Sequence, residues 1–265
     1  MIKRFILMIQ FFTRIPVPVN VDAKPEDFGR GLAFAPLVGL FIGGLLCGVF
    51  TLVSLVFPSF ICSALVIAAY AVITGGLHFD GLGDTFDGVF SNRSKERIFE
   101  IMKDSRVGTN AVLVLIFVIL MDILSLTYIN QYHSVSFPIF CILFMPVSGR
   151  IGSAIGAGLH RYARNDDGLG RYFVDHCSKK EMLISIFLYI IVFLISSIIS
   201  GVFKNSALML VALVCAFAAI ICAVLTSCYF AMKLGGVTGD ILGAVCEINQ
   251  LIFLMLSAAF QYVFI

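Results

Sequence analysis

Long uninterrupted apolar runs constrain this 265-residue chain more than any other feature. A helix needs roughly 20 apolar residues to cross a hydrocarbon core of about 30 Å. Hydrophobic residues make up 60% of the chain and charged residues only 13%, and no period-two alternation typical of membrane barrels is present. The pattern predicts an all-α integral membrane protein, a polytopic bundle of about seven transmembrane helices. The predicted spans are 31–57, 59–77, 109–130, 136–159, 182–203, 206–232 and 241–264.

Basic residues are distributed unevenly between the two ends of this bundle. Of the 18 Lys and Arg residues, only Arg150 and Lys204 fall outside the N-terminal segment and the connections on its side of the membrane. Positive residues favour the cytoplasm, so the N-terminus and the long loops 78–108 and 160–181 are predicted to face it. The same rule, with an odd number of spans, predicts that the C-terminus lies outside.

The N-terminal residues 1–12 mix apolar and basic side chains. No small-residue cleavage site follows them, so an interfacial helix fits better than a signal peptide. The eight cysteines lie mostly inside the predicted spans and form no CxxC pair, which indicates small buried hydrophobes rather than disulfides or zinc ligands.

The first acidic cluster follows the second predicted span. Asp80, Asp84 and Asp87 stand at i, i+4 and i+7, which on a helix places them within about a 60° arc. Three carboxylates on one stripe repel one another unless a cation neutralises them, and oxygen ligands suit Mg²⁺ or Mn²⁺. The alternative is a solvated acidic face. Glycines within the segment weaken a regular helix but allow a phosphate or another backbone to approach.

A second cluster opens the last predicted span. Asp240 and Glu247 stand at i, i+7, with Gly243 on the same side, and a glycine-rich turn at 235–239 can present backbone N–H groups to an anion. Carboxylates near a bilayer are expensive, so two such clusters predict a shared divalent-cation site. His78 either assists this site, by orienting a carboxylate, binding phosphate or transferring a proton, or is a structural histidine at the end of a span.

Basic residues close to these clusters supply the opposite charge. Arg150 is predicted inside the fourth span, where an unpaired guanidinium is costly. Arg161 and Arg164 either bind phosphate or simply obey the positive-inside rule. Acidic metal ligands beside arginine forks at a membrane surface indicate phosphoryl or nucleotidyl transfer. No Walker loop is present, which argues against ATP hydrolysis.

Several strings of the chain, taken in order, resemble the cobalamin synthase family, the adenosylcobinamide-GDP ribazoletransferases. The most specific are His-x-Asp-Gly-x-x-Asp-x-x-Asp-Gly at 78–88 and Met-Lys-Asp-Ser-Arg at 102–106. Further matches run nearly end to end: 12–18, 30–32, 36–39, 100–108, 161–164, 168–170, and Gly239-Asp240 with Gly243 and Glu247.

The resemblance implies a Mg²⁺-dependent enzyme of the cytoplasmic membrane. Such an enzyme joins adenosylcobinamide-GDP to α-ribazole or α-ribazole 5′-phosphate and releases GMP. Its partners are then these substrates and membrane lipid, not nucleic acid, and the family is compatible with a homo-oligomer or with docking of other pathway enzymes. Residues 1–265 are expected to form a single membrane-embedded catalytic domain with cytoplasmic active-site loops.

The charged clusters and the resemblance together predict a role for each candidate site residue. The expected metal ligands are Asp80, Asp84, Asp87, Asp104, Asp240 and Glu247. Asp84 or Asp87 is the expected catalytic base for the acceptor hydroxyl. The expected substrate-binding residues are His78, Lys103, Arg106, Arg150, Arg161 and Arg164.

Two other classes remain open on sequence alone. A CDP-alcohol phosphotransferase uses related chemistry, but its Asp-x-x-Asp-Gly-x-x-Ala-Arg string is missing, because Val-Phe-Ser-Asn follows Gly88 here. A cation transporter would need acids that cross the bilayer midplane, whereas most acids of this chain cluster at one face.

Overall fold

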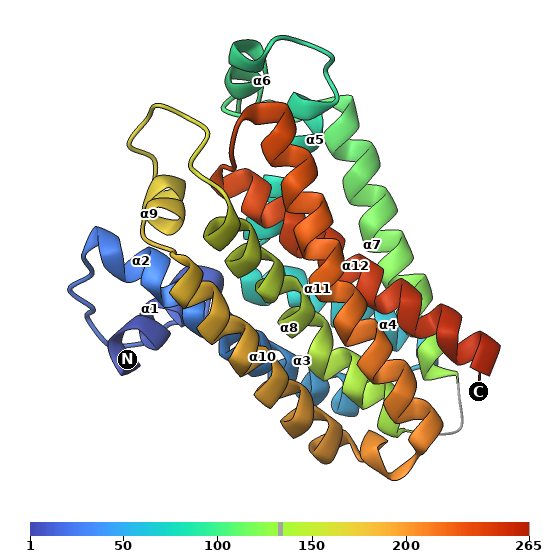
Figure 1. Cartoon of the computed structure of the whole chain (residues 1–265). Coiled ribbons are helices and arrows are strands. Elements are labelled where there is room, and N and C mark those ends of the chain that lie inside the picture. The colour runs from blue at the N-terminus through green and yellow to red at the C-terminus, as the bar shows by residue number, and fades with distance from the viewer. Residues whose placement is uncertain (132–134, 265) are drawn as a thin grey trace.

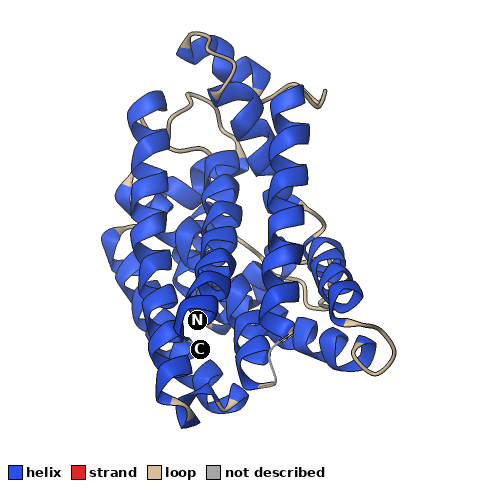
Figure 2. Cartoon of the chain, turned by 90° about the vertical axis from the view of Figure 1, so that its right-hand side faces the viewer, coloured by secondary structure: helices blue, strands red, loops and turns tan. Residues whose placement is uncertain are grey.

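The computed structural model describes residues 1–131 and 135–264. Within these ranges the chain is helical and contains no strand longer than an isolated bridge. The predicted all-α architecture is confirmed (Figure 2). Six segments of the described chain are long and apolar enough to cross a membrane. They are Pro25–Val53, which joins α2 (Pro25–Gly31), η1 (Leu32–Phe34) and α3 (Ala35–Val53), then α7 (Thr109–Asn130), α8 (Ser136–Leu159), α10 (Lys179–Ser200), α11 (Ser206–Leu234) and α12 (Gly239–Phe264).

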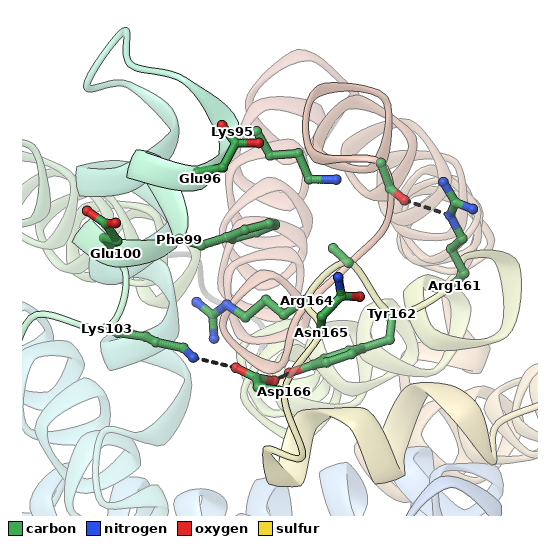
Figure 3. Close-up of a pocket in the computed structure, with 12 residues that line it drawn as sticks. Lys95, Glu96, Phe99, Glu100, Lys103, Arg161, Tyr162, Arg164, Asn165 and Asp166 are labelled. Carbon is green, nitrogen blue, oxygen red and sulfur yellow. Dashed lines mark hydrogen bonds and ion pairs between the residues drawn. The ribbon is translucent and has the colours of Figure 1, made fainter.

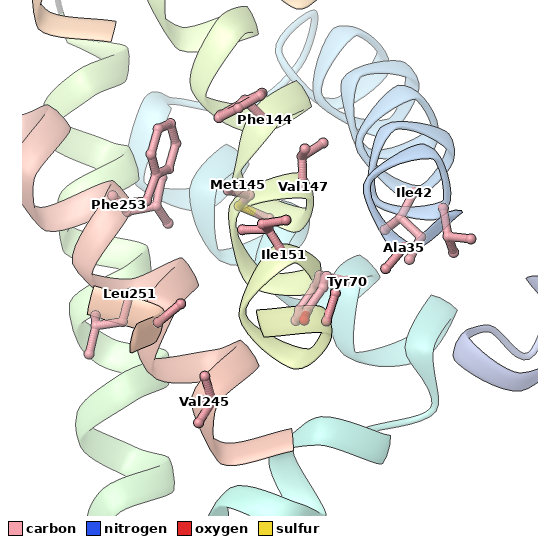
Figure 4. Close-up of a cluster of buried hydrophobic side chains, with 14 of the residues drawn as sticks. Ala35, Ile42, Tyr70, Phe144, Met145, Val147, Ile151, Val245, Leu251 and Phe253 are labelled. Carbon is pink, nitrogen blue, oxygen red and sulfur yellow. The ribbon is translucent and has the colours of Figure 1, made fainter. Parts of the chain in front are cut away.

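Helix α8 lies at the centre of the bundle (Figure 1), and its residues are almost entirely buried. Helices α3, α10, α11 and α12 pack around it. Phe144, Met145 and Ile151 of α8 contribute to a continuous apolar core together with Ile42 of α3 and Phe253 of α12 (Figure 4). Because the other long helices expose apolar side chains on their outer faces, the bundle has the surface that lipid requires.

The predicted second span differs from the structure. Helix α4 (Ser59–Thr74) is followed by α5 (Leu77–Val89), and the two helices meet at 90°. Gly75 and Gly76 adopt φ values of 64° and 70°, a left-handed conformation that glycine reaches without the steric cost of a Cβ atom. Two such residues in succession end α4 three residues earlier than predicted and turn α5, which carries the first acidic cluster, across the bundle.

The remaining short elements lie at one end of the bundle. They are α1 (Ile2–Phe12), α6 (Lys95–Ile101) and α9 (Leu169–Asp175), and in Figure 1 they surround the start of α12 and the C-terminal end of α8. The opposite end carries η2 (Val202–Lys204) and the end of α12. We call the first the basic end, because it holds every Lys and Arg except Arg150 and Lys204.

Helix α1 is too short to span a membrane and packs on α2 and α3. Lys3 and Arg4 attach it to α2, because their side chains donate hydrogen bonds to Asp27 at 2.8 and 3.0 Å. The eight cysteines are all free thiols, as the sequence predicted.

Candidate active site

Helices α5 and α12 cross in direct backbone contact at the basic end. A Cβ atom at Gly81 of α5 would lie 2.8 Å from the carbonyl oxygen of Asp240 and 3.0 Å from its Cα atom, so only glycine permits this approach. Gly243 of α12 faces the same crossing, with the Cα of His78 nearby. The crossing brings the start of the second acidic cluster beside the first.

The carboxylates at this crossing share little positive charge from the protein. Asp84 is half-buried, and the negative charges of Asp80, Asp240 and Asp87 all act on it. The nearby guanidinium is that of Arg164, which pairs with Asp240 at 2.8 Å. Within the described chain, Asp80 and Asp84 form no ion pair.

Asp87 lies at the edge of this group and has a second role. Its two carboxylate oxygens accept hydrogen bonds from the backbone N–H groups of Gly108 at 2.6 Å and Ala111 at 2.9 Å. It therefore caps the start of α7, where a negative charge is also favoured by the helix dipole. A carboxylate has about four lone-pair positions, so this capping still leaves Asp87 acceptor capacity.

The donor set of Asp80, Asp84 and Asp240 has the chemistry that a hard divalent cation prefers, although the ligand atoms of these three carboxylates do not all lie within 4.8 Å of one another. Asp80, Asp84 and Asp240 offer oxygen ligands only, and their mutual repulsion is relieved by an added positive charge. We name the three residues the carboxylate cluster. They come from two helices, so a cation held there would also tie α5 to α12.

A cavity of about 600 Å³, whose lining Figure 3 shows, is connected to the carboxylate cluster through Arg164, which lines the cavity and pairs with Asp240. Phe99 of α6 lies between two cations, with the Nζ of Lys95 5.6 Å and the guanidinium carbon of Arg164 5.5 Å from its ring centroid. Arg161 donates a hydrogen bond from Nε to the carbonyl oxygen of Gly235 at 2.9 Å, which fixes it at the rim. We call this the basic cavity; it is lined by Lys95, Glu96, Phe99, Glu100, Lys103, residues 161–166 and Gly235.

Asp166 anchors one wall of the basic cavity. Lys103 pairs with it at 2.5 Å, and the hydroxyl of Tyr162 donates to it at 2.8 Å (Figure 3). Partial burial by itself raises the pKa of Asp166, but the hydrogen bonds from Lys103 and Tyr162 outweigh it and hold that pKa below its usual value. Burial, and then the hydrogen bond to Asp166, raise the pKa of Tyr162, so its hydroxyl stays protonated at neutral pH.

Two of the predicted site residues lie away from this cavity. Asp104 and Arg106 pair with each other at 2.6 Å in the exposed connection between α6 and α7. The hydrogen bonds from Arg106 lower the pKa of Asp104 to about 2, so the pair remains ionised at neutral pH. The structure does not bring Asp104 into the carboxylate cluster.

Glu247 and Arg150 also lie elsewhere, in the interior of the bundle. Both are fully buried, and the hydroxyl of Tyr70 connects them. Arg150 donates to this hydroxyl at 2.7 Å, and the hydroxyl donates to Glu247 at 2.6 Å. The network therefore places opposite charges in the core with a hydrogen-bonded bridge between them, which reduces the cost of burying each.

His78 extends this network to the start of α5. Its Nδ1 lies 3.8 Å from Glu247 Oε1 and 3.6 Å from the Sγ of Cys246. The ligand atoms of these three buried residues lie within 4.8 Å of one another. Because the guanidinium of Arg150 already provides a positive charge there, we regard this group as a structural network and not as the cation site.

Sequence reasoning missed Tyr70, Phe99 and Tyr162 as members of these networks. An aromatic residue within an apolar span carries no signal that its hydroxyl bridges two charges, so Tyr70 could not be singled out. Phe99 and Lys95 stand at i, i+4 on α6 and thus share a helix face beside Lys103, which is a signal that the spacing does offer.

Together, the helical bundle, the carboxylate cluster and the basic cavity define a polytopic membrane enzyme built for phosphoryl-group chemistry. The cobalamin-5-phosphate synthase (CobS) family model matches residues 4–258, and the chain belongs to this family.

Relatives named adenosylcobinamide-GDP ribazoletransferase match over nearly the whole chain. The one from Acetivibrio thermocellus is 49% identical over 260 residues, covering 98% of this chain and 99% of its own. The one from Clostridium acetobutylicum is 48% identical, with 98% and 97% covered, and that from Caldanaerobacter subterraneus is 38% identical, with 95% and 96% covered. No solved structure matches the chain.

Proposed function

We propose that this chain is a Mg²⁺-dependent transferase that joins adenosylcobinamide-GDP to α-ribazole or α-ribazole 5′-phosphate. A ribose hydroxyl of the acceptor attacks the phosphorus on the cobinamide side of the diphosphate. A new P–O bond forms, the bond to the bridging oxygen breaks, GMP leaves, and the hydroxyl proton passes to a base. The observation that carries the proposal is the meeting of the carboxylate cluster and the basic cavity at one end of a bundle of this family.

Asp80, Asp84 and Asp240 are the residues that would hold Mg²⁺. When bound, the ion neutralises charge on the diphosphate oxygens and on the leaving phosphate. Asp84 is half-buried between the two helices and is our choice for the base that accepts the hydroxyl proton. Asp87 lies on α5 at the edge of this group, and its carboxylate caps the start of α7.

The basic cavity would bind the guanosine diphosphate part of the donor. Arginine and lysine side chains match phosphate oxygens, and Arg164 reaches from this cavity to Asp240, so it lies where the diphosphate must meet the carboxylate cluster. Tyr162 offers an aromatic face to a purine base, and Phe99 holds the cations of Lys95 and Arg164 in place beside it. Lys103 and Arg161 complete the positive rim.

Orientation follows from the same arrangement. The donor and acceptor are charged, water-soluble molecules of the cytoplasm, and the basic end carries nearly all the positive residues. We therefore place the basic end, with the N-terminus, on the cytoplasmic side of the inner membrane.

Product formation by the purified, detergent-solubilised protein tests the proposal. The protein is given adenosylcobinamide-GDP and α-ribazole 5′-phosphate, with Mg²⁺ or with excess chelator. We expect GMP and a new cobamide in equal amounts, with Mg²⁺ only, and restored activity when Mg²⁺ is added back. Folded protein that forms no product in the presence of lipid and both substrates would refute the proposed reaction. Equal product with chelator would refute the metal requirement alone.

A further inference from the structure

A second, smaller cavity of about 260 Å³ lies on the other side of the carboxylate cluster. Its lining is mainly apolar, and one wall is aromatic: Phe11 and Phe12 come from α1 and Phe173 comes from α9. We call it the aromatic cavity; the remaining lining residues that matter here are His78 and Asp80 of α5 and Asp240 of α12.

The aromatic side chains form a contiguous wall. The ring centroids of Phe11 and Phe173 lie 4.7 Å apart, those of Phe12 and Phe173 6.2 Å, and those of Phe12 and His78 5.4 Å. The planes of Phe12 and Phe173, and of Phe12 and His78, are tilted by only 34° and 37°. Flat rings at these spacings suit a flat aromatic ligand placed against them.

The two cavities share one polar wall. Arg164 lines the basic cavity, Asp240 lines the aromatic cavity, and the two side chains pair at 2.8 Å. A ligand in either cavity therefore reaches the carboxylate cluster from its own side. This is the arrangement that a transfer between two different substrates needs.

Size and chemistry distinguish the occupants. A volume of about 260 Å³ lies below the roughly 300–1,000 Å³ of sites for drug-sized ligands, so it admits one flat bicyclic ring system but not a corrinoid. Guanine carries polar groups along its edges that need hydrogen-bond partners, and the basic cavity offers those. The benzimidazole of ribazole has an apolar edge, which the phenylalanine rings can cover without such partners.

From these observations we infer that the aromatic cavity binds the heteroaromatic base of the acceptor nucleoside and thereby presents its ribose hydroxyl to Asp80, Asp84 and Asp240. The inference rests on the proposed function for the identity of the acceptor. It adds a binding site for the acceptor, separate from that of the donor, and it gives α1 a role in catalysis through Phe11 and Phe12.

The test measures binding and kinetics of Phe173→Ala and of the matched variant Phe99→Ala in the basic cavity. α-Ribazole binding to detergent-solubilised protein is measured by equilibrium dialysis without donor or Mg²⁺, so that no turnover occurs. Phe173→Ala is expected to raise the Kd and KM for α-ribazole about tenfold, with the donor KM within twofold of wild type. Phe99→Ala is expected to raise the donor KM and leave the Kd for α-ribazole unchanged. Phe173→Met, which keeps apolar volume but not the flat ring, should give an intermediate Kd.

Each result decides one point. The inference would be overturned if folded Phe173→Ala bound α-ribazole as tightly as wild type. It would also be overturned if Phe99→Ala lost α-ribazole binding to the same extent. Product formation by wild type would then still support the proposed function. If Phe173→Ala lost α-ribazole binding but wild type formed no product, the aromatic cavity would still be the binding site for the base, and the proposed reaction would be refuted. Phospholipid binding that weakens in Phe173→Ala, with no effect of that change on α-ribazole affinity, would identify the cavity as a lipid site and also overturn the inference.

Discussion

Arg164 and Asp240 pair at 2.8 Å on the wall between the basic cavity and the aromatic cavity. The side chain of Arg164 is only 11% exposed, so its charge is well shielded from solvent. This guanidinium partly compensates the carboxylate cluster and also faces the donor side. Its position couples the affinity of the cluster for a cation to the binding of the diphosphate.

Replacing Arg164 by Gln should separate these two effects. Loss of the compensating charge is expected to increase the affinity of the carboxylate cluster for Mn²⁺, a spectroscopic substitute for Mg²⁺, because opposite charges attract more strongly in a less neutralised site. Turnover should fall about a hundredfold, since the diphosphate loses a positive partner. Electron paramagnetic resonance of Mn²⁺ and steady-state kinetics give both values. Arg171→Gln, which breaks exposed pairs with Asp167 and Asp175, is the control and should change neither. Weaker Mn²⁺ binding by Arg164→Gln would contradict the account.

Gly81→Ala tests the close crossing of α5 and α12. The new Cβ atom would meet the carbonyl oxygen of Asp240 at 2.8 Å, so the helices must separate by some tenths of an ångström. Small misplacements of catalytic groups cost up to about a hundredfold in rate, and we expect a tenfold to hundredfold loss of turnover. Gly44→Ala in α3 is the matched control, because a Cβ there meets no atom within 4 Å. It should retain activity and gain about 0.5 kcal/mol of stability. Equal turnover in the two variants would show that the crossing does not position the carboxylates.

The buried bridge from Arg150 through Tyr70 to Glu247 is expected to be costly to break. Tyr70→Phe removes one hydroxyl and leaves two buried charged groups without that partner, at about 2 kcal/mol or more of unfolding free energy. Tyr189→Phe is the comparison, since the hydroxyl of Tyr189 donates only to the carbonyl oxygen of Ala216. It should cost about 1 kcal/mol. Reversible unfolding in mixed micelles measures both; a smaller loss for Tyr70→Phe than for Tyr189→Phe would contradict the role assigned to the bridge.

The pairing of Lys103 with Asp166 sets a defined dependence on pH. Because the pKa of Asp166 is lowered in the folded protein, its contribution to stability is complete above the unfolded value of about 3.9 and is lost as pH falls through the folded value. The difference in unfolding free energy between wild type and Asp166→Asn should stay constant, at about 1 kcal/mol or less, from pH 9 to pH 5 and shrink below about pH 4. The donor KM of Asp166→Asn should rise severalfold. Asp175→Asn, which alters an exposed pair on the same end, should leave the donor KM unchanged. A difference that appeared only above pH 7 would contradict the assignment.

Much of the fold was predictable because lipid imposes strong rules on sequence. The apolar runs gave α7, α8 and α11 to within two residues, since each must satisfy its backbone internally across the membrane. The 90° turn after Thr74 was not predicted. Two consecutive glycines are ordinary loop signals, and only the surrounding packing decides that both adopt positive φ.

The carboxylate cluster was partly visible in the sequence. Helical spacing placed Asp80, Asp84 and Asp87 on one helix, and the structure adds Asp240 through the contact at Gly81. Spacing alone predicted that Asp240 and Glu247 share one metal site, because residues at i and i+7 lie on the same helix face. They are, however, about 10 Å apart along α12, so Asp240 lies at the basic end and Glu247 lies in the buried bridge. The aromatic cavity left no local signal at all, since its walls come from α1, α5, α9 and α12.

Metal binding and turnover of Asp84→Asn, measured on the same preparation, test the central claim most directly. Asp167→Asn is the control, because Asp167 is on the basic end but its side chain is 92% exposed. We expect Asp84→Asn to insert and fold, to bind Mn²⁺ at least tenfold more weakly, and to lose nearly all formation of GMP and cobamide. Asp167→Asn should match wild type in both. Wild-type turnover and Mn²⁺ affinity in Asp84→Asn would contradict the assignment of the carboxylate cluster as the catalytic cation site.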